Sequence, residues 1–368
     1  MTVSIDGANG VVFNDLSTQN TAAIGFGFKS RIINGAMVID QRNAGASVTP
    51  SADGYILDRF AQFQSVPSKF SFQQNAGAVT PPIGFSNYFG CTVVSAYSII
   101  AGSYYIIRQN IEGFNTADFG WGTSSASPAT LSFWVRSSLT GTFGGSLSNS
   151  AANRSYPFTY SIPTANTWIY VTLTIAGDTT GTWLTNSSTG IQVNLGLGVG
   201  STYSGTAGSW AVGNLTSATG AVSVVGTSGA TFYITGVQLE KGSTATSFDY
   251  RDYGRELIMC QRYLPVWSGA DIGAVFQAGG ATLLYGSLPC AVQTRVPATG
   301  IVVSSAAHFS AWGSNTAPNV CNGMGFFSAS TYSVWLAPTV ASGLAAGNAT
   351  RFFSNTVSAL IYGTGCEL

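Results

Sequence analysis

The sequence predicts an all-β protein, and three observations lead to this prediction. Many short stretches alternate apolar and polar residues with a period of two, which is typical of half-buried strands. Clusters of Gly, Ser, Thr and Asn separate these stretches and indicate turns. Only 8% of the residues are charged, while 45% are hydrophobic. Disordered chains combine low hydrophobicity with high net charge, so this composition favours a packed fold.

Four stretches show the alternation most clearly: Tyr104–Glu112, Thr130–Ser137, Thr167–Ala176 and Thr231–Leu239. In the last of them Gly236 interrupts the pattern, and we expect a β-bulge or the close approach of another group there. Many short strands with this spacing predict a sandwich or jelly roll rather than an α/β fold.

The segments between and after these strands complete the expected architecture. The Gly- and Ser-rich stretches 141–153 and 177–190 are expected to form loops. Good helix formers predict one helix over Gly254–Tyr263, close to a change in composition. Further strands are expected at Ala274–Gly286, Thr299–His308 and Ser328–Pro338.

At 368 residues the chain is too long for one ordinary sandwich. We expect an extended N-terminal attachment arm at 1–30, a jelly-roll domain at 31–255 and a smaller β-sandwich at 256–368. Within the arm, Val11, Val12 and Phe13 could hardly bury their side chains alone, so the arm is expected to dock on another protein or on symmetry mates. No fixed-period repeat is present, which disfavours a parallel β-helix.

The charge pattern excludes several classes of function. Fourteen basic residues balance fourteen acidic ones, and without a basic cluster the chain is not expected to bind nucleic acid. No apolar run reaches the ~18 residues of a membrane-spanning helix. The first ten residues lack the features of a secretory signal, so synthesis and folding in the cytoplasm are expected.

Five cysteines without CxxC spacing indicate neither a zinc site nor a disulfide framework. We expect free, mostly buried thiols. They are Cys91, Cys260, Cys290, Cys321 and Cys366.

No set of residues predicts catalysis. His308 is the only histidine and has no acidic neighbour in sequence, so a satisfied or surface histidine is favoured over a member of a catalytic triad. Glycoside hydrolysis needs two placed carboxylates. Asp118 and Asp178 lie in expected loops, but nothing in the sequence ties them into a pair.

No metal or cofactor is expected either. Asp53 and Asp58 could supply oxygen ligands for calcium, but Asp53 followed by Gly54 is more typical of an ordinary turn. Because charged residues are scarce, Asp58-Arg59 and Arg251-Asp252 are expected to form ion pairs or to hydrogen-bond loop backbone.

The aromatic residues are the best candidates for binding. Trp134 and Trp168 lie within expected strands and should pack in the core or on the second face of a sheet. Trp121, Trp183 and Trp312 are flanked by Gly, Ser and Thr, which is compatible with exposure on loops. Sugar contact and subunit packing both use such side chains, so no ligand-binding residue is assigned.

Three stretches resemble bacteriophage tail-fibre and appendage proteins that carry a jelly-roll domain related to carbohydrate-binding modules. Gly10–Ala23 (GVVFNDLSTQNTAA) resembles a short element that precedes the folded domains of tail-fibre proteins. Arg31–Arg42 (RIINGAMVIDQR) with Tyr55–Phe60 (YILDRF) is similar to the opening of the sandwich domain. Phe232–Tyr263 (FYITGVQLEKGSTATSFDYRDYGRELIMCQRY) is similar to its long closing signature.

The resemblance covers roughly residues 31–263, with Phe60 in place of the family's usual Trp and Phe248-Asp249 in place of Phe-Glu. It implies a structural protein of the virion, commonly a homotrimer, joined to other virion proteins and able to adhere to host surface polysaccharide. A capsid decoration or head-fibre protein and a glycan-degrading spike remain as alternatives.

In the physical reading, the closing signature is structural. Apolar residues of its first strand are expected to lie beside an opening strand, and each contributes roughly 1.5–3 kcal/mol when buried. The residues are Phe232, Ile234, Val237 and Leu239 in the closing strand, and Ile32, Ile33 and Met37 in the opening one.

Overall fold

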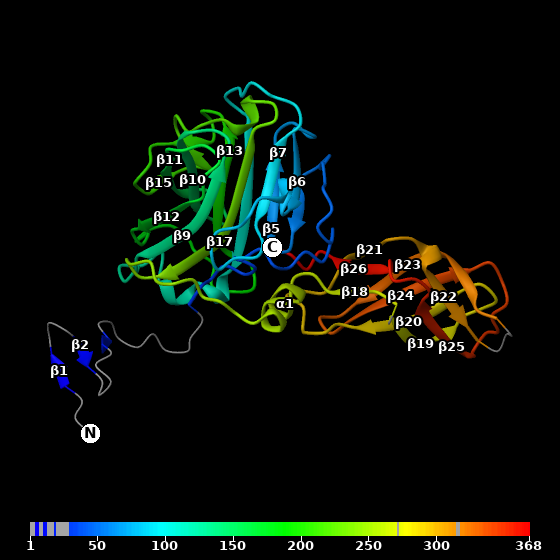
Figure 1. Ribbon diagram of the computed structural model, residues 1–368. Coiled ribbons are helices and arrows are strands. Elements are labelled where there is room, and N and C mark those ends of the chain that lie inside the picture. Colours follow the sequence, from blue (N-terminus) through cyan, green and yellow to red (C-terminus); the bar gives the residue numbers. More distant parts are fainter. Residues whose placement is uncertain (1–3, 7–9, 13–17, 20–28, 271, 314–316) are drawn as a thin grey trace.

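The computed structural model describes residues 4–6, 10–12, 18–19, 29–270, 272–313 and 317–368. The all-β prediction is confirmed: two large sheets form a sandwich, followed by a smaller β unit (Figure 1). The seven-stranded sheet has the order β15 (Ala211–Val212), β11 (Arg154–Ile162), β10 (Gly141–Asn149), β13 (Thr189–Val199), β8 (Tyr104–Glu112), β5 (Phe60–Gln64) and β4 (Gly54–Leu57). The five-stranded sheet has the order β12 (Ile169–Ile175), β9 (Ala129–Ser137), β17 (Thr231–Lys241), β7 (Phe89–Val93) and β6 (Phe70–Gln74). Two short parallel strands, β14 (Ser204–Gly205) and β16 (Ser217–Ala218), pair only with each other, and β16 packs against β10, β11 and β13.

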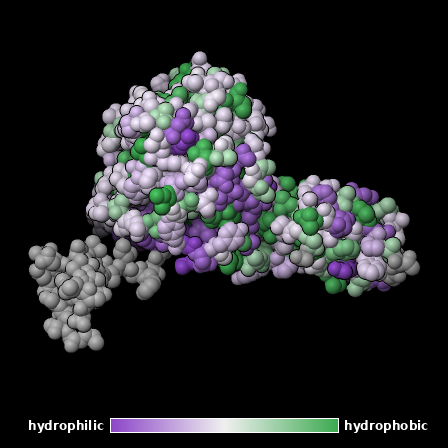
Figure 2. All heavy atoms as spheres, viewed as in Figure 1, coloured by the Kyte–Doolittle hydropathy of each residue, from purple (hydrophilic) through white to green (hydrophobic). Residues whose placement is uncertain are grey.

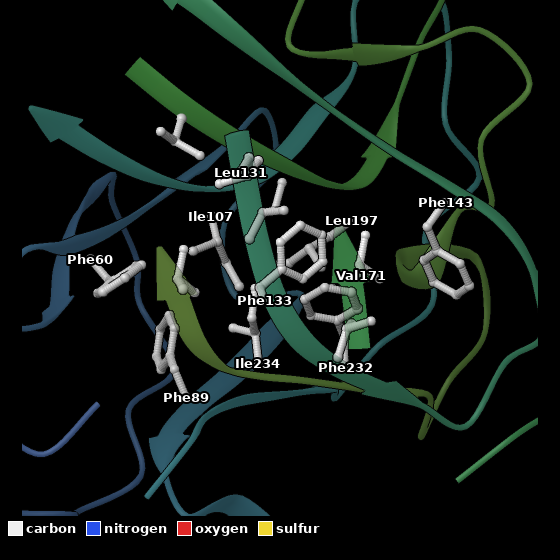
Figure 3. Packing of buried hydrophobic residues seen from close by; sticks show 14 of the residues in the cluster. Phe60, Phe89, Ile107, Leu131, Phe133, Phe143, Val171, Leu197, Phe232 and Ile234 are labelled. Carbon is white, nitrogen blue, oxygen red and sulfur yellow. The ribbon is translucent and has the colours of Figure 1, made fainter. Parts of the chain in front are cut away.

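The two sheets share one hydrophobic core. Phe143 of β10 faces Phe232 of β17, with ring centroids 6.2 Å apart, and Phe133 of β9 lies beside them (Figure 3). All three side chains are fully buried. Burial of a phenylalanine side chain contributes about 1.5–3 kcal/mol, so this aromatic layer is a major source of the sandwich's stability.

The alternating stretches form the strands expected of them. Strand β8 has the predicted bounds, and β9, β12 and β17 differ from their predicted bounds by no more than two residues at either end. In β17 the register with β9 shifts between Thr235 and Gln238. Gly236 lies in this shift with φ 63°, which confirms the predicted bulge.

The expectation of a loop over 141–153 is wrong. Gly141–Asn149 is strand β10, inside the seven-stranded sheet. Its glycines are needed because neighbouring atoms leave no room for a side chain, and not because the strand must be flexible. A Cβ on Gly144 would lie 2.5 Å from Ser217 Oγ, and one on Gly145 would lie 2.3 Å from a neighbouring backbone oxygen. The other expected loop, 177–190, extends to residue 188, where β13 follows.

The opening segment runs beside β17, but it is not a strand. Arg31 N donates to Leu239 O and Val237 N donates to Gly35 O, at 2.8 and 3.0 Å. The ladder partners of β17 are β7 and β9. The opening segment therefore extends the sheet only by these separate bonds, and its apolar side chains Ile32 and Met37 still reach the core.

The N-terminal segment contains three short strands that pair with one another in antiparallel fashion. They are β1 (Ser4–Asp6), β2 (Gly10–Val12) and β3 (Thr18–Gln19). Phe13 and the side chains of Val11 and Val12 lie outside the described residues, so their docking role stays a prediction.

The C-terminal unit is all β as expected, but its strands close into a barrel instead of forming a sandwich. Strand β19 pairs with both β20 and β25, and β22 pairs with both β25 and β23. This closure leaves no free edge in the ring of six strands. The ring is β19 (Gly273–Ala278), β20 (Leu284–Pro289), β24 (Ser333–Val340), β23 (Asn319–Ala329), β22 (Phe309–Trp312) and β25 (Ala349–Ser354). A three-stranded sheet accompanies it, made of β18 (Val266–Ser268), β26 (Leu360–Thr364) and β21 (Gly300–Val303).

The predicted helix is present as α1 (Tyr253–Gln261), between the sandwich and the barrel (Figure 1). Asp252 caps it by accepting a hydrogen bond from Arg255 N at 2.9 Å, as Asp commonly does at a helix start. Within the described part of the chain, no helix is long and apolar enough to cross a membrane. The short 3-10 turns are η1 (Ala76–Ala78), η2 (Gly113–Asn115), η3 (Ala117–Phe119), η4 (Val224–Gly226) and η5 (Ala306–His308).

A buried polar junction follows α1 and ties it to the sandwich. The Glu112 side chain at the end of β8 is only 2% exposed. It accepts hydrogen bonds from Arg262 Nε and Nη2, at 3.0 and 2.6 Å, and from Tyr263 Oη at 2.6 Å. Arg59 lies 3.6 Å from the centroid of the Tyr263 ring. Arg59 also donates to the backbone oxygen of Asn110, which belongs to strand β8, so it bonds backbone as expected but in a strand rather than in a loop.

Residues 366–368 also contact the sandwich. Glu367 forms an ion pair with Arg42 at 2.5 Å. The main-chain oxygen of Leu368 accepts hydrogen bonds from Tyr55 Oη and Asn110 Nδ2, at 2.7 and 2.8 Å. This tail is therefore a second link between the barrel and the sandwich.

The remaining charged residues of the two signatures are paired as predicted. Asp58 accepts hydrogen bonds from the backbone and side chain of Gln41, at 2.7 and 2.6 Å. Arg251 forms ion pairs with Asp249 and Glu256, at 3.1 and 3.4 Å.

All five cysteines are free thiols, and four are buried, with Cys290 intermediate. The prediction of free, mostly buried thiols is therefore confirmed.

Candidate functional site: an aromatic groove

A groove of about 590 Å³ lies on the outer face of the five-stranded sheet. Strands β9, β12 and β17 supply its floor, and two loops supply its walls. The floor residues are Ser132, Trp134, Tyr170, Thr172 and Gly236. The wall residues are Ile83, Phe85, Ala245, Thr246, Ser247, Phe248 and Tyr250.

The alternation of β9 places Trp134 in the groove. Phe133 and Val135, its two neighbours, are fully buried in the core, so Trp134 must point to the opposite face. Tyr170 is its cross-strand partner in β12, and the two ring centroids are 5.2 Å apart. Aromatic cross-strand pairs stabilise a sheet, and this pair, with its ring planes tilted by 42°, also presents aromatic surface to the groove.

A second aromatic group forms one wall. The ring centroids of Phe85 and Phe248 are 5.0 Å apart, and those of Phe248 and Tyr250 are 4.9 Å apart. Both contacts are edge-to-face, the geometry that aromatic rings prefer. Tyr250 is 59% exposed and Tyr170 on the floor is 44% exposed, so both ends of the groove present aromatic surface to solvent.

Gly236 joins these two groups. A Cβ at this position would lie 2.7 Å from Phe85 Cζ and 3.1 Å from Trp134 Cδ1. The glycine therefore allows both rings to close over the bulge of β17. The result is one continuous aromatic surface from floor to wall.

Buried polar contacts hold the wall in place. Glu240 of β17 is 4% exposed and accepts hydrogen bonds from Thr246 N and Oγ1, at 2.9 and 2.7 Å. Gln238 Oε1 accepts a hydrogen bond from Asp249 N at 2.8 Å. Because these acceptors belong to a core strand, the loop that carries Phe248 and Tyr250 is fixed before any ligand arrives. The groove thus offers rigid aromatic faces beside Ser and Thr hydroxyls, which suits ligands with flat C–H faces and many hydroxyl groups.

Of the tryptophans singled out in the sequence, Trp134 alone lines this groove. Trp168 is partly buried and donates from Nε1 to Thr80 O at 2.9 Å. Trp312 is 42% exposed at the end of β22. The expectation that Trp121 is exposed is wrong. Its side chain is 7% exposed and packs edge-to-face against Trp183, with ring centroids 4.8 Å apart.

The candidate carboxylates are occupied elsewhere. Asp118 forms an ion pair with Arg31 at 2.9 Å. Asp178 accepts two hydrogen bonds from Arg154, at 2.8 and 2.6 Å. Burial opposes ionisation of Asp178, but the hydrogen bonds from Arg154 and Thr180 and the positive charge of Arg154 together outweigh it, and the pKa of Asp178 lies below its ordinary value. Neither residue lines the aromatic groove.

The other candidates make ordinary local contacts. Asp53 Oδ1 accepts a hydrogen bond from Gln64 N at 2.8 Å. His308 Nδ1 lies 2.9 Å from Ser304 Oγ. Among the described residues, no three His, Cys, Asp or Glu side chains gather as metal ligands.

Sequence reasoning missed most of the groove. The alternation in 167–176 already placed Tyr170 opposite the core face, but nothing marked that face as a site. Phe85, Phe248 and Tyr250 lie in loops, and only tertiary packing brings them to Trp134.

The chain matches no protein-family model, and no curated protein is similar to it in sequence. Solved structures are similar to part of it, and three of them each align with 58% of this chain. The enzymatically active domain of tailspike protein 4 from bacteriophage CBA120 is 12% identical with a TM-score of 0.28, and the match covers 21% of that chain. TmCBM61, solved with β-1,4-galactotriose, is 8% identical with a TM-score of 0.31 over 99% of its length. A putative sugar-binding protein from Bacteroides thetaiotaomicron is 10% identical with a TM-score of 0.30 over 100% of its length.

The chain therefore spans about a fifth of the tailspike domain and nearly all of the two sugar-binding structures. At these TM-scores the similarities add no argument beyond the β-sandwich architecture that the chain itself shows.

Proposed function

We propose that this chain is a tail-fibre-like appendage of a bacteriophage virion that adheres to host surface glycans without catalysing a reaction. The aromatic groove is the observation that carries the proposal. Sugar rings present C–H faces that stack on aromatic side chains, and their hydroxyls pair with exposed side-chain hydroxyls such as those of Thr172 and Ser247. A preformed groove with a few polar groups is typical of ligand sites.

The lining of the groove supports binding rather than hydrolysis. No carboxylate or histidine is among the residues that line it. Cleavage of a glycosidic bond by the usual mechanism requires an acid and a base or nucleophile on either side of the bond. A glycan held in this groove meets side-chain hydroxyls, aromatic rings and the aliphatic side chains of Ile83 and Ala245.

The virion location rests on the resemblance of three sequence stretches to phage appendage proteins. The surface is compatible with it: charged residues make up 8% of the chain, and Figure 2 shows a largely pale surface with strongly hydrophilic residues in small groups. In this proposal the N-terminal segment attaches the chain to other virion proteins.

We place subunit contacts of a homotrimer on the outer face of the barrel. Tyr285 of β20, Trp335 of β24 and Phe327 of β23 are 38%, 43% and 62% exposed on adjacent strands. Exposed aromatic residues in such a stripe are typical of interfaces.

A cryo-EM reconstruction of the virion tests location and copy number together. Trimers on the tail support the proposal, and copies spread over the capsid identify a head decoration protein instead.

The binding proposal is tested by glycan-array screening of the wild-type chain, Trp134→Ala and Tyr170→Ala. Each stacking contact contributes about 0.5–1.5 kcal/mol, so each variant should bind its glycan roughly two- to tenfold more weakly. Trp312→Ala, which removes an exposed tryptophan far along the chain in the barrel, is the control and should bind as wild type. An equal loss in all three variants, or no glycan bound by the wild type, contradicts the proposal.

A further inference from the structure

A second cavity, of about 210 Å³, lies on the outer face of the seven-stranded sheet and shares no residue with the aromatic groove. Strands β5 and β8 form its floor, and residues after β13 form its wall. The residues that matter for its chemistry are Asp53, Phe63, Tyr104, Arg108, Tyr203 and Asn214. Pockets for drug-sized ligands measure about 300–1,000 Å³, so this cavity is suited to a single ring.

Arg108 is held in this cavity from two sides. Its guanidinium carbon lies 4.5 Å from the centroid of the Phe63 ring. Its Nε donates to Asn194 Oδ1 at 2.6 Å. Asn194 is itself fully buried and donates to Ser146 Oγ and Ser148 Oγ, at 3.0 and 3.3 Å. Stacking and this buried chain of hydrogen bonds fix the orientation of the guanidinium.

Among the described residues, no carboxylate forms an ion pair with this guanidinium within 4 Å, and Asp53, which lines the same cavity, acts on it only from a longer distance. Arg31, Arg42, Arg154, Arg251 and Arg262 each contact a carboxylate within 4 Å, whereas Arg108 contacts none. No described residue accepts a hydrogen bond from Arg108 Nη1 or Nη2, and neither atom is among the buried unpaired atoms. Both nitrogens therefore remain open to solvent.

Burial affects the charge of this side chain. It lowers the pKa of Arg108 to about 10, which is the direction expected for a cation that has lost water without gaining a full counter-charge. A planar guanidinium with two free N–H groups recognises a carboxylate by two parallel hydrogen bonds.

Aromatic side chains adjoin the arginine. Tyr104 and Tyr203 pack edge-to-face with ring centroids 5.5 Å apart, and both line the cavity. The Asn214 side chain adds an amide beside them. A ligand here meets a cation, aromatic C–H and ring surfaces, and two groups that can bond hydroxyl groups, the Asn214 amide and the Asp53 carboxylate.

We infer that this cavity binds a sugar residue that carries a carboxylate, such as a uronic acid, with the carboxylate on Arg108 and the ring against Tyr104 and Tyr203. This site is separate from the aromatic groove and does not depend on the glycan proposed to bind there.

The test uses saturation-transfer NMR with the full chain and two probes, methyl glucuronide or galacturonide and the corresponding methyl glucoside or galactoside. Each pair differs in the carboxylate. We expect the uronide to bind at least tenfold more tightly than its neutral partner, and Arg108→Gln to abolish this preference. Arg108→Lys keeps the positive charge but loses the planar arrangement of N–H donors that bonds both oxygens of a carboxylate. It should therefore retain only part of the preference for the uronide.

Two controls separate this site from other effects. Arg351→Gln removes an exposed arginine that stacks on Phe353 at 4.7 Å and should leave uronide binding unchanged. Trp134→Ala should also leave it unchanged, so failure of the groove and failure of this site are distinguishable. Thermal unfolding of both Arg108 variants confirms that they are folded.

Four results overturn the inference. The first is equal binding of the uronide and its neutral partner. The second is an unchanged preference in a folded Arg108→Gln or Arg108→Lys variant. The third is acetate binding as tightly as the uronide, which identifies a plain anion site without a sugar contact. Absence of uronide binding at millimolar concentrations likewise rejects it.

Discussion

Gly236 lies in the bulge of β17 with φ 63°, and the rings of Phe85 and Trp134 close over it. An L-residue at positive φ is strained by about 1–3 kcal/mol, and a Cβ here would also displace the Phe85 ring. Gly236→Ala should therefore lower the free energy of unfolding by about 1–3 kcal/mol and weaken binding in the aromatic groove. Urea unfolding and glycan titration measure the two effects.

Gly102→Ala is the matched control for that substitution. Gly102 has nothing within 4 Å of an added Cβ, and it is not among the glycines with positive φ. This variant should match the wild type in both measurements. If Gly236→Ala also matches the wild type, the two rings do not depend on the glycine for their positions.

At the residue scale, the sequence predicts which face of a sheet a side chain occupies better than it predicts which side chains it contacts. Alternation in 130–137 is enough to place Trp134 opposite the core. Trp121 shows the limit: its Gly, Ser and Thr neighbours indicate a loop, and it does lie outside the strands, but the ring is buried against Trp183. Local composition does not report which loops fold back over the core.

Among the elements, strands were predictable where apolar residues alternate and were missed where small residues replace them. The alternation of apolar and polar residues is enough to predict strand β8. Strand β10 instead carries Gly and Ser, and its glycines are packed closely against other segments of the chain. The same composition is typical of a turn. Only the neighbouring strands, distant in sequence, distinguish the two cases.

The junction after α1 gives a prediction at this scale. Glu112 is 2% exposed and holds both Arg262 and Tyr263. Glu112→Gln leaves the Arg262 charge without its partner, but the Arg262 side chain is 34% exposed, so the loss should be smaller than for a fully buried pair, about 1.5–3 kcal/mol. Thermal and urea unfolding should show this loss of stability.

Asp118→Asn provides the comparison. Asp118 pairs with Arg31, but its side chain is 49% exposed, and exposed ion pairs contribute at most about 1 kcal/mol. Similar losses in Glu112→Gln and Asp118→Asn would show that the junction is not what holds α1 against the sandwich.

For the whole molecule, the tail gives a pH dependence. Burial raises the pKa of Glu367 from 4.5 to about 7, despite the opposing effect of Arg42. Between these values the folded chain holds a proton that the unfolded chain has released. The contribution of this group to stability is therefore fully present below the unfolded pKa and is lost as pH rises through about 7.

Glu367→Gln removes this titration while keeping the shape of the side chain. Urea unfolding between about pH 5 and about pH 8 should show the wild type losing stability relative to the variant as pH rises. Asp58, whose pKa burial also raises, and Arg42 are present in both proteins, so the difference isolates Glu367. Parallel pH profiles would contradict the prediction.

The whole architecture was predictable as all β, but the closed barrel was not. Closure depends on the pairing of β19 with β25, whose residues lie about 75 positions apart (Gly273 pairs with Phe353 and Gln277 with Ala349). A period of two identifies each strand but says nothing about which distant strand it meets. Sandwich and barrel therefore have the same local sequence pattern.

The cysteines give each hydrophobic core its own chemical reporter. Cys91 belongs to the sandwich core and Cys321 to the barrel core. Burial raises the pKa of both thiols, that of Cys321 to about 12, so an alkylating reagent cannot modify either one until its surroundings open. Timed alkylation followed by mass spectrometry then reads the opening of the sandwich and of the barrel separately in one sample, with no engineered label in the chain.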